Sequence, residues 1–227
     1  NDRILENITG PYTVSTCFNQ CTTDGSCVAV LGCTDPEALN YVPAATEEDG
    51  SCVYFAESTL PIIEITTPEA IPDDPRIIGS MAVINNPSGF NQVGDAPTDY
   101  DGQISIEIRG SSSQMFPKKS YALETQTAEG ENNNMPLLGM PQENDWILHG
   151  PYTDKTLMRN AIVFELGTQL DRYTTRRRYC ELFINGDYRG VYMLMENIKR
   201  DVNRVDIATL LPSCLLYTSD AADDRMR

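Results

Sequence analysis

Hydrophobic and polar residues alternate in several short stretches of the chain. The clearest stretch is "QISIEIRG" at 103–110, where Ile104, Ile106 and Ile108 fall on one face. A period of two predicts a β-strand with one face buried. Strands are also predicted for four further stretches, "LPIIEITT" at 60–67, "RIIGSMAVI" at 76–84, "KKSYALETQT" at 118–127 and "DWILHG" at 145–150.

A helical pattern occupies "DKTLMRNAIVFELGTQL" at 154–170, with apolar residues at 157, 158, 161, 162, 164 and 166. Asp154 is expected to be its N-cap. The stretch "RRRYCELFINGDYRGVYMLMENI" at 176–198 predicts a hairpin that turns at "NGD". The polar stretch 128–145 is expected to be turns. Strands, one main helix and a hairpin together predict an α+β fold with a mostly antiparallel sheet.

The N-terminal region is rich in cysteine and turn-forming residues. Five of the seven cysteines lie in the first 52 residues: Cys17, Cys21, Cys27, Cys33 and Cys52. The motif "DGSCV" occurs at 24–28 and again at 49–53, and a repeat this short cannot bury a core. We therefore expect a disulfide-stapled module in an oxidising compartment, with Cys33–Cys52 as the natural pair. Zinc is the alternative, but only Cys17 and Cys21 have a suitable spacing.

This module resembles the short Cys/Asp-rich repeats of secreted and surface proteins of environmental Bacteroidetes. Its Asp35, Asn40 and Asp49 either hold calcium or simply form turns, and turns are favoured because no D-x-D-x-D-G spacing occurs.

The formal net charge of −16 argues against a nucleic-acid partner, which needs a basic face on the protein. The sequence contains no run of 18 or more apolar residues, so no transmembrane segment is predicted. The chain starts at Asn1 without a methionine or signal peptide, and we interpret it as a fragment whose targeting signal is missing.

The last stretch, "SCLLYTSDAADDRMR", resembles a translated sequencing adapter. The expected organisation is a Cys/Asp-rich repeat module at 1–52, a linker at 53–60, the main domain at 61–212 and a non-native tail at 213–227.

The stretch "IEIRGSSSQMFPKKSYALE" at 106–124 places three serines and two lysines at one turn. Short side chains and free backbone N–H groups allow a loop to approach an anion closely. Lys118 and Lys119 point to opposite faces of a strand, so only one of them can reach a site beside the sheet. The alternative is an exposed turn with solvated lysines.

Three blocks of this chain follow one another in the order seen in the spore-coat protein H (CotH) kinase family. They are the stretch just quoted, "NDWILHGPYTDKTLMRNAIVFELG" and "CELFINGDYRGVYMLMENIKRDVNRVDI". The resemblance runs from about residue 60 to 211. It implies an atypical protein-kinase-like fold and phosphorylation of serines in a partner protein, with ATP and Mg²⁺ or Mn²⁺ as cofactors.

The same resemblance implies roles for individual residues. The nucleotide-binding residues would be Arg109, Ser111, Ser112, Ser113, Lys118, Lys119, Glu165, Glu196 and Asn197. In this interpretation Glu165 is the ion-pair partner of one lysine, and the strand that ends at Glu196 receives adenine. Asp154 and Arg159 bracket a helix start, where anions are favoured.

The chain departs from the family at the catalytic acid. Many members carry an acid where this chain has Lys199, so Asp201 and Asp206 become the candidate catalytic residues. The metal-binding acid of the family lies downstream, and its identity here is unknown. We therefore expect the stretch to residue 212 alone to bind nucleotide weakly and not to catalyse transfer. His149 and Trp146 are expected to be structural.

Three classes of function remain. One is a secreted or cell-surface ATP-dependent protein serine kinase, whose partner is a protein substrate with acceptor serines. Another is a non-catalytic surface adhesion or scaffold protein on the same fold, which the missing acid and the attached Cys-rich repeat favour. A carbohydrate-associated module is a third possibility, but few aromatic residues are present to stack on sugars.

Overall fold

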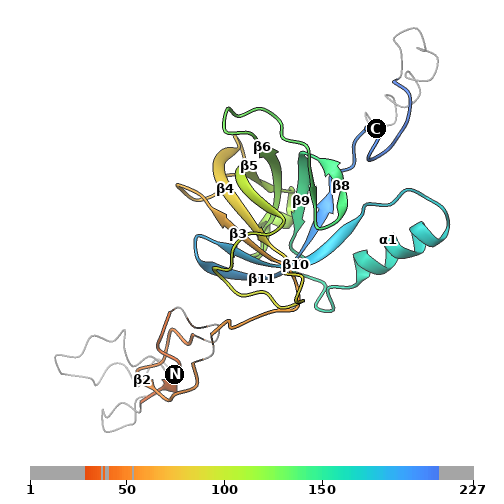
Figure 1. Ribbon diagram of the computed structural model, residues 1–227. Coiled ribbons are helices and arrows are strands. Elements are labelled where there is room, and N and C mark those ends of the chain that lie inside the picture. The colour runs from red at the N-terminus through yellow and green to blue at the C-terminus, as the bar shows by residue number, and fades with distance from the viewer. Residues whose placement is uncertain (1–28, 37, 39–40, 53, 210–227) are drawn as a thin grey trace. The chain divides into compact units, whose positions relative to one another are not determined.

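A computed structural model describes residues 29–36, 38, 41–52 and 54–209. The chain divides into two compact units, one of residues 1–58 with 92–94 and one of residues 59–91 with 95–227 (Figure 1). Several predictions fall outside the described residues: those for Cys17, Cys21, Cys27 and Asn40, the first copy of "DGSCV", and the tail.

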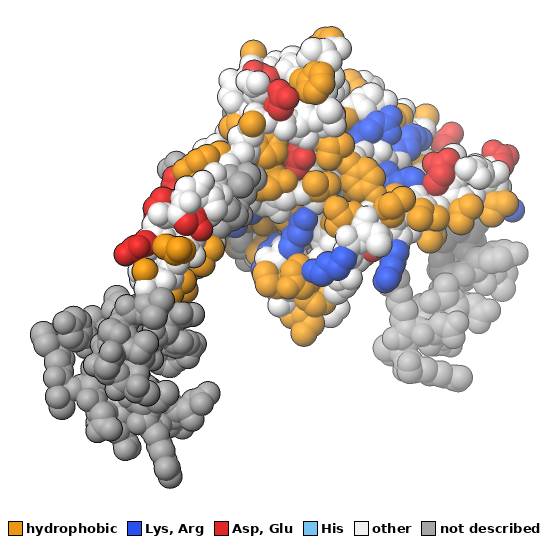
Figure 2. Space-filling view, turned by 90° about the horizontal axis from the view of Figure 1, so that it is seen from below, with side chains coloured by type: hydrophobic (Ala, Val, Ile, Leu, Met, Phe, Trp, Pro, Cys, Tyr) orange, Lys and Arg blue, Asp and Glu red, His pale blue; other side chains and the backbone are white. Residues whose placement is uncertain are grey.

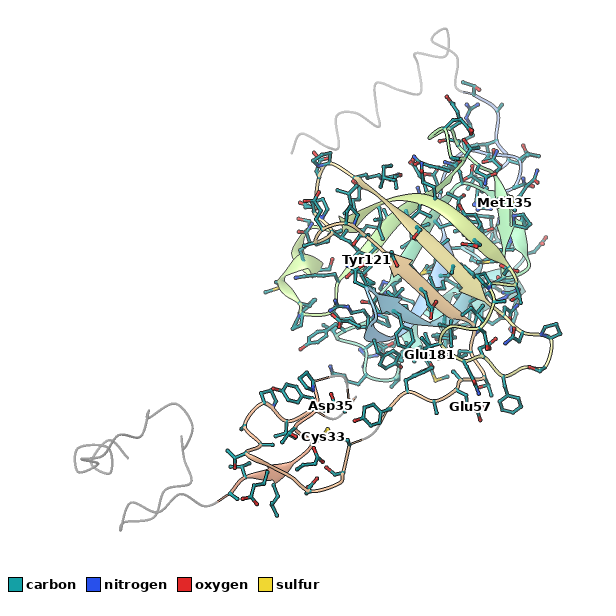
Figure 3. All side chains as sticks on the ribbon, turned by 60° about the vertical axis from the view of Figure 1, so that its left-hand side comes forward. Cys33, Asp35, Glu57, Tyr121, Met135 and Glu181 are labelled. Atoms are coloured by element: carbon teal, nitrogen blue, oxygen red, sulfur yellow. A yellow bond between two sulfur atoms is a disulfide. The ribbon has the colours of Figure 1, made fainter. Side chains whose placement is uncertain are left out.

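The smaller unit is held by a disulfide. Cys33 and Cys52 are bonded, with their Cα atoms 4.8 Å apart, which confirms the predicted pair (Figure 3). Next to it, β1 (Leu31–Gly32) pairs in parallel with β2 (Glu47–Glu48). The carboxylate of Asp49 accepts a hydrogen bond from the backbone N of Ser51 at 2.9 Å, which is the local contact of a turn-forming aspartate.

The larger unit is built around a closed barrel of seven strands. They are β3 (Ile62–Thr66), β4 (Ile77–Ile84), β5 (Tyr100–Arg109), β6 (Ser120–Gln126), β9 (Asp145–His149), β10 (Arg177–Ile184) and β11 (Asp187–Glu196). Their order is β10-β11-β9-β6-β5-β4-β3. Neighbours are antiparallel except β10 and β3, whose parallel pairing closes the barrel. The core contains Ile104 and Ile106, and Ile108 packs against it, as the alternation predicts.

The barrel corrects the expected fold. The prediction of an α+β, atypical protein-kinase-like fold was wrong, because the described residues form a mostly β structure with a closed barrel and one α-helix. The individual strands were predicted correctly, but alternation within a strand carries no information about which distant strand closes the sheet. The closing contact joins Ile62–Ile65 to Glu181–Ile184, more than 115 residues along the chain.

The structure also differs from two local predictions. Within 128–145, a small hairpin forms from β7 (Met135–Leu137) and β8 (Met140–Glu143), and its Leu137 and Met140 are buried in the core. The helix α1 (Arg159–Gln169) starts at Arg159 and takes Met158 as its N-cap residue in place of Asp154.

Helix α1 has no buried residue. Its Ile162, Val163 and Leu166 are exposed, and Leu170 follows at its C-cap. In Figure 1 the helix projects from the barrel. Among the described residues, no helix has the length and apolarity needed to cross a membrane.

Cys180 on β10 is a free thiol among the described residues, as predicted, and it is fully buried in the barrel core. Burial raises the pKa of its thiol to about 12, so almost no reactive thiolate exists at neutral pH. We expect alkylation of Cys180, followed by peptide mass spectrometry, to be slow in the native protein and fast in denaturant. Rapid native labelling would show that the barrel opens on the labelling timescale.

Candidate functional site

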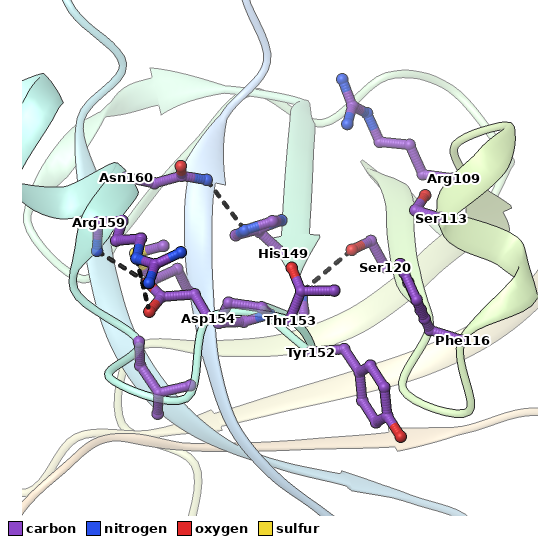
Figure 4. Close-up of a pocket in the computed structure, with 14 residues that line it drawn as sticks. Arg109, Ser113, Phe116, Ser120, His149, Tyr152, Thr153, Asp154, Arg159 and Asn160 are labelled. Atoms are coloured by element: carbon purple, nitrogen blue, oxygen red, sulfur yellow. Dashed lines mark hydrogen bonds and ion pairs between the residues drawn. The ribbon is translucent and has the colours of Figure 1, made fainter.

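A cavity of about 310 Å³ lies where three segments of the larger unit meet (Figure 4). The first is the end of β5 with the short 3₁₀ turn Ser112–Met115, the second is the end of β9 with the loop after it, and the third is the start of α1. The lining residues are Arg109, Ser113, Phe116, Ser120, His149, Gly150, Pro151, Tyr152, Thr153, Asp154, Leu157, Arg159, Asn160 and Met193.

Strand register brings these segments together. Arg109 on β5 pairs with Ser120 on β6, and the next residue of β6, Tyr121, pairs with Leu148 on β9. The last residue of β9, His149, therefore lies at the same end of the sheet as Arg109. The backbone N of Gly150 donates to Ser120 Oγ at 3.0 Å, which ties the loop after β9 to β6.

Gly150 is packed too closely for a side chain. A Cβ there would lie 2.6 Å from the backbone oxygen of Lys119 and 2.9 Å from the Tyr192 ring. We expect Gly150→Ala to lower the free energy of unfolding by about 1–3 kcal/mol, because overpacking forces the backbone to shift. Gly150 does not have a positive φ, so urea unfolding of this variant reports the clash alone, whereas Gly130→Ala, at φ +85° with no atom within 4 Å of the added Cβ, reports backbone strain alone. A loss below about 0.5 kcal/mol for Gly150→Ala would contradict the tight contact.

The pocket is cationic. It contains the guanidinium groups of Arg109 and Arg159, both on exposed residues, and the imidazole of His149. Ser113 and Thr153 add hydroxyl groups. Lys and Arg side chains gather on the face of the larger unit that Figure 2 shows from below. In a chain of net charge −16, such a cluster favours an anionic ligand.

Among the described residues, Asp154 is the one carboxylate that lines the pocket, and both of its oxygens accept hydrogen bonds. One oxygen accepts from the backbone N of Arg159 at 2.8 Å, and the other accepts from the hydroxyl of Thr156 at 2.6 Å. These bonds, to the Thr156 hydroxyl first and to the Arg159 backbone next, lower the pKa of Asp154. Asp154 thus stabilises the start of α1 from outside the N-cap position, and the side chain of Arg159 lies 3.7 Å away.

His149 is half-buried, and its Nε2 lies 3.1 Å from the amide nitrogen of Asn160. Burial lowers the pKa of the imidazole, and the positive charges of Arg109 and Lys118 lower it further. A neutral imidazole can accept the Asn160 hydrogen bond at Nε2.

The two lysines point to different partners and do not line the pocket. Lys118 Nζ donates to the backbone oxygen of Val191 at 2.6 Å and lies 4.6 Å from the centre of the Tyr192 ring. Burial lowers the pKa of Lys118. Lys119 Nζ donates to the backbone oxygen of Gln114, so it holds the serine turn that contributes Ser113. Ser111 and Ser112 are exposed and lie outside the pocket lining.

The structure does not bring Glu165 to the lysines. Its carboxylate pairs with Arg177 at 3.6 Å and accepts from Gln169 at 3.3 Å, on an exposed part of α1. The described contacts of Lys118 and Lys119 go to backbone carbonyls instead. The predicted lysine–glutamate ion pair was therefore wrong.

Glu196 ends β11 with its side chain fully buried. One oxygen bonds Arg176 at 2.8 Å and Arg204 at 2.9 Å, and the other accepts from the hydroxyl of Tyr173 at 3.3 Å. The neighbouring Asn197 is half-buried. The side chain of Glu196 is thus committed to the interior, which leaves only backbone groups at this position for a ligand.

Asp201 and Asp206 lie in the segment after β11. Asp201 Oδ1 accepts from the backbone N of Asn203 at 2.7 Å, so its carboxylate forms a local turn. Asp206 is exposed. Neither residue lines the pocket.

A buried ionic network, which sequence reasoning missed, anchors this segment. Arg204 is buried against the Trp146 ring, with its guanidinium carbon 4.9 Å from the ring centre. Lys199 bonds Glu143 at 2.7 Å and also bonds Asp145. Burial opposes the charge on Lys199, but these two carboxylates outweigh it and raise its pKa. The only signal in the sequence is that Glu196 ends a buried strand and must find a partner.

The candidate residues therefore fall into two groups. Arg109, Ser113 and Arg159 meet His149 at one end of β9, whereas Lys199 and its neighbours meet the other end at Asp145. Four residue steps along a strand separate these ends by about 13 Å.

Comparison with known families agrees with the motifs in the sequence. The family model described as CotH kinase protein matches residues 106–225, just over half of the 227-residue chain. The matched range contains every residue that lines the pocket, and it starts within β5. A comparison with curated proteins gave no match. With three motif blocks in order and more than half of its length matched, the chain belongs to the CotH kinase family.

Proposed function

We propose that this domain works in a secreted or cell-surface ATP-dependent protein serine kinase, and that the pocket holds the phosphates of ATP. The observation that carries the proposal is the meeting of Arg109, Ser113, His149 and Arg159 in one cavity of a CotH-family chain. Phosphoryl transfer depends mainly on positioning and on stabilising phosphate charge, which cationic groups in a pocket supply. The Cys33–Cys52 disulfide supports an oxidising compartment.

The pocket residues fit a polyphosphate. Arg109 and Arg159 come from opposite walls, and guanidinium groups bind phosphate oxygens through paired hydrogen bonds. The start of α1 adds backbone N–H groups, and Ser113 and Thr153 add hydroxyl donors. Lys119 contributes indirectly, because its ammonium fixes the turn that presents Ser113.

The same residues fit a divalent metal less well. Mg²⁺ bound to nucleotide usually takes one or two protein carboxylates, and the described lining supplies only Asp154, whose oxygens already accept hydrogen bonds. Asp201 and Asp206 remain proposed catalytic acids from the sequence alone.

The alternative is a surface adhesion or scaffold protein that binds phosphate groups without transferring them. It is favoured by the distance of about 13 Å between the ends of β9, which separates the pocket from the segment with Asp201. The acceptor of the kinase would be serines of a partner protein, and nothing in the pocket selects a particular sequence.

Isothermal titration calorimetry with ATP tests the proposal on this chain. We expect weak but saturable binding that inorganic tripolyphosphate displaces and that adenosine does not, since the phosphates supply the affinity. Transfer of label from ATP to a serine-containing protein then separates the kinase from the scaffold. Failure of ATP and tripolyphosphate to bind would remove the proposed function.

A further inference from the structure

His149 has no role in the proposal above beyond its place in the pocket. It is the only histidine of the chain, and it lies at the end of β9 among cationic groups from several segments. The charged residues around it are Arg109 from β5, Lys118 from the loop before β6, Asp154 from the loop after β9 and Arg159 from α1. Ser120 from β6, Tyr152 from the loop after β9, Asn160 from α1 and Met193 from β11 also line the pocket.

We infer that His149 selects the charge state of the ligand: the pocket takes a dianionic phosphoryl group, and binding is coupled to uptake of one proton by the imidazole. The inference rests on the proposed phosphate site and goes beyond it, because it names the preferred anion and assigns a binding role to a residue outside the nucleotide-binding motifs.

In the pocket without ligand, the neutral form of His149 is favoured. Burial disfavours the imidazolium form, and the positive charges of Arg109 and Lys118 disfavour it further, so the pKa of His149 lies below its ordinary value. Asp154 does not offset this effect, since its carboxylate is turned to the Thr156 hydroxyl and to the backbone of Arg159.

A bound dianion favours the protonated form of His149 instead. It neutralises part of the field from the arginines, so the positive charge of a protonated imidazole becomes less unfavourable. The pKa of His149 must then rise on binding, and by linkage the affinity must rise as the pH falls toward the pKa of the free pocket. A phosphodiester, with one negative charge, would produce a smaller shift.

The same depressed pKa affects folding in the absence of ligand. The unfolded chain protonates His149 near pH 6.5, whereas the folded chain does so only at lower pH. Stability contributed by the neutral ring is therefore present above about pH 6.5 and is lost as the pH falls through that value toward the folded pKa. A dianion in the pocket should reduce this loss.

Proton NMR of the single imidazole tests the inference directly. Sulfate is the probe, because it remains a dianion between pH 5 and 8 and its own titration cannot interfere. We expect saturating sulfate to raise the midpoint of the His149 titration by about one pH unit, which corresponds to about tenfold tighter binding of sulfate to the protonated pocket. Sodium chloride at matched ionic strength is the control for screening, and dimethyl phosphate is the monoanionic control.

Three variants test whether the shift comes from this pocket and from His149. Arg109→Ala should reduce the sulfate-induced shift, whereas Arg178→Ala, which removes an exposed arginine outside the pocket, should preserve it. His149→Gln retains an acceptor for Asn160 and should bind sulfate with an affinity that no longer depends on pH between 5 and 8. Sulfate binding that leaves the His149 midpoint unchanged, or an equal shift with dimethyl phosphate, would overturn the inference. Either result would leave the ATP site to be judged by the ATP and tripolyphosphate titrations.

Discussion

Replacing Arg204 by alanine is expected to lower the free energy of unfolding by about 3–5 kcal/mol. The side chain is fully buried, pairs with the equally buried Glu196 at 2.9 Å and covers the Trp146 ring. Removal leaves the Glu196 carboxylate with Arg176, whose side chain is 40% exposed, and opens a cavity over the ring. A buried carboxylate that loses its buried partner and a cavity are both among the costly consequences of single substitutions.

Urea unfolding, followed by the fluorescence of Trp146 and independently by circular dichroism, measures this loss. Trp146 is the only tryptophan of the chain, so the signal reports the site itself. The matched control is Arg189→Ala, which breaks an exposed pair with Asp187 and should cost less than about 1 kcal/mol. Similar unfolding midpoints for the two variants would show that the buried network contributes little.

The double variant Arg109→Ala/Arg159→Ala is expected to weaken ATP binding by about a hundredfold. A hydrogen bond to a charged group contributes about 1.5–3 kcal/mol, and the lower value for each arginine suits two exposed side chains. Each single substitution should therefore cost about tenfold, and the two should be nearly additive, because the arginines come from separate segments.

Calorimetric titration at fixed ionic strength gives these affinities. Lys119→Ala is expected to have a smaller effect than Arg109→Ala, because Lys119 holds Gln114 of the serine turn and does not line the pocket. Arg178→Ala is the control of matched charge and should bind ATP as the unaltered chain does. If Lys119→Ala abolished binding while the double arginine variant retained it, the phosphates would have to lie on the lysine.

The fold shows where local sequence patterns are sufficient. The alternation at 103–110 and the "NGD" turn predict β5 and the β10–β11 hairpin because neighbouring residues determine them. Closure of the barrel depends on the pairing of β3 with β10 and on contacts such as Thr67 N to Asn185 Oδ1, over 118 residues. The hairpin of β7 and β8 was missed because the stretch 128–145 is polar and rich in turn formers, although Leu137 and Met140 supply a buried side.

The site was predictable in its parts and not in its assembly. From the sequence, the serine turn at Ser111–Ser113 was either an anion site or an exposed turn, and the family resemblance added the start of the helix, where anions are favoured. The serine turn and the start of α1 meet because β5, β6 and β9 are neighbours in the barrel, and a single sequence does not reveal this strand order. The lone His149 gave no signal, because its chemistry comes from the arginines and the lysine placed around it by the barrel.

We propose that ATP phosphates bind between the serine turn and the start of α1, and a crystal structure of the chain soaked with a non-hydrolysable ATP analogue would show where they lie. We predict phosphate density within hydrogen-bond distance of Arg109 and Arg159, with the His149 imidazole facing it. Phosphates found at the other end of β9, beside Lys199 and Asp201, would contradict the account.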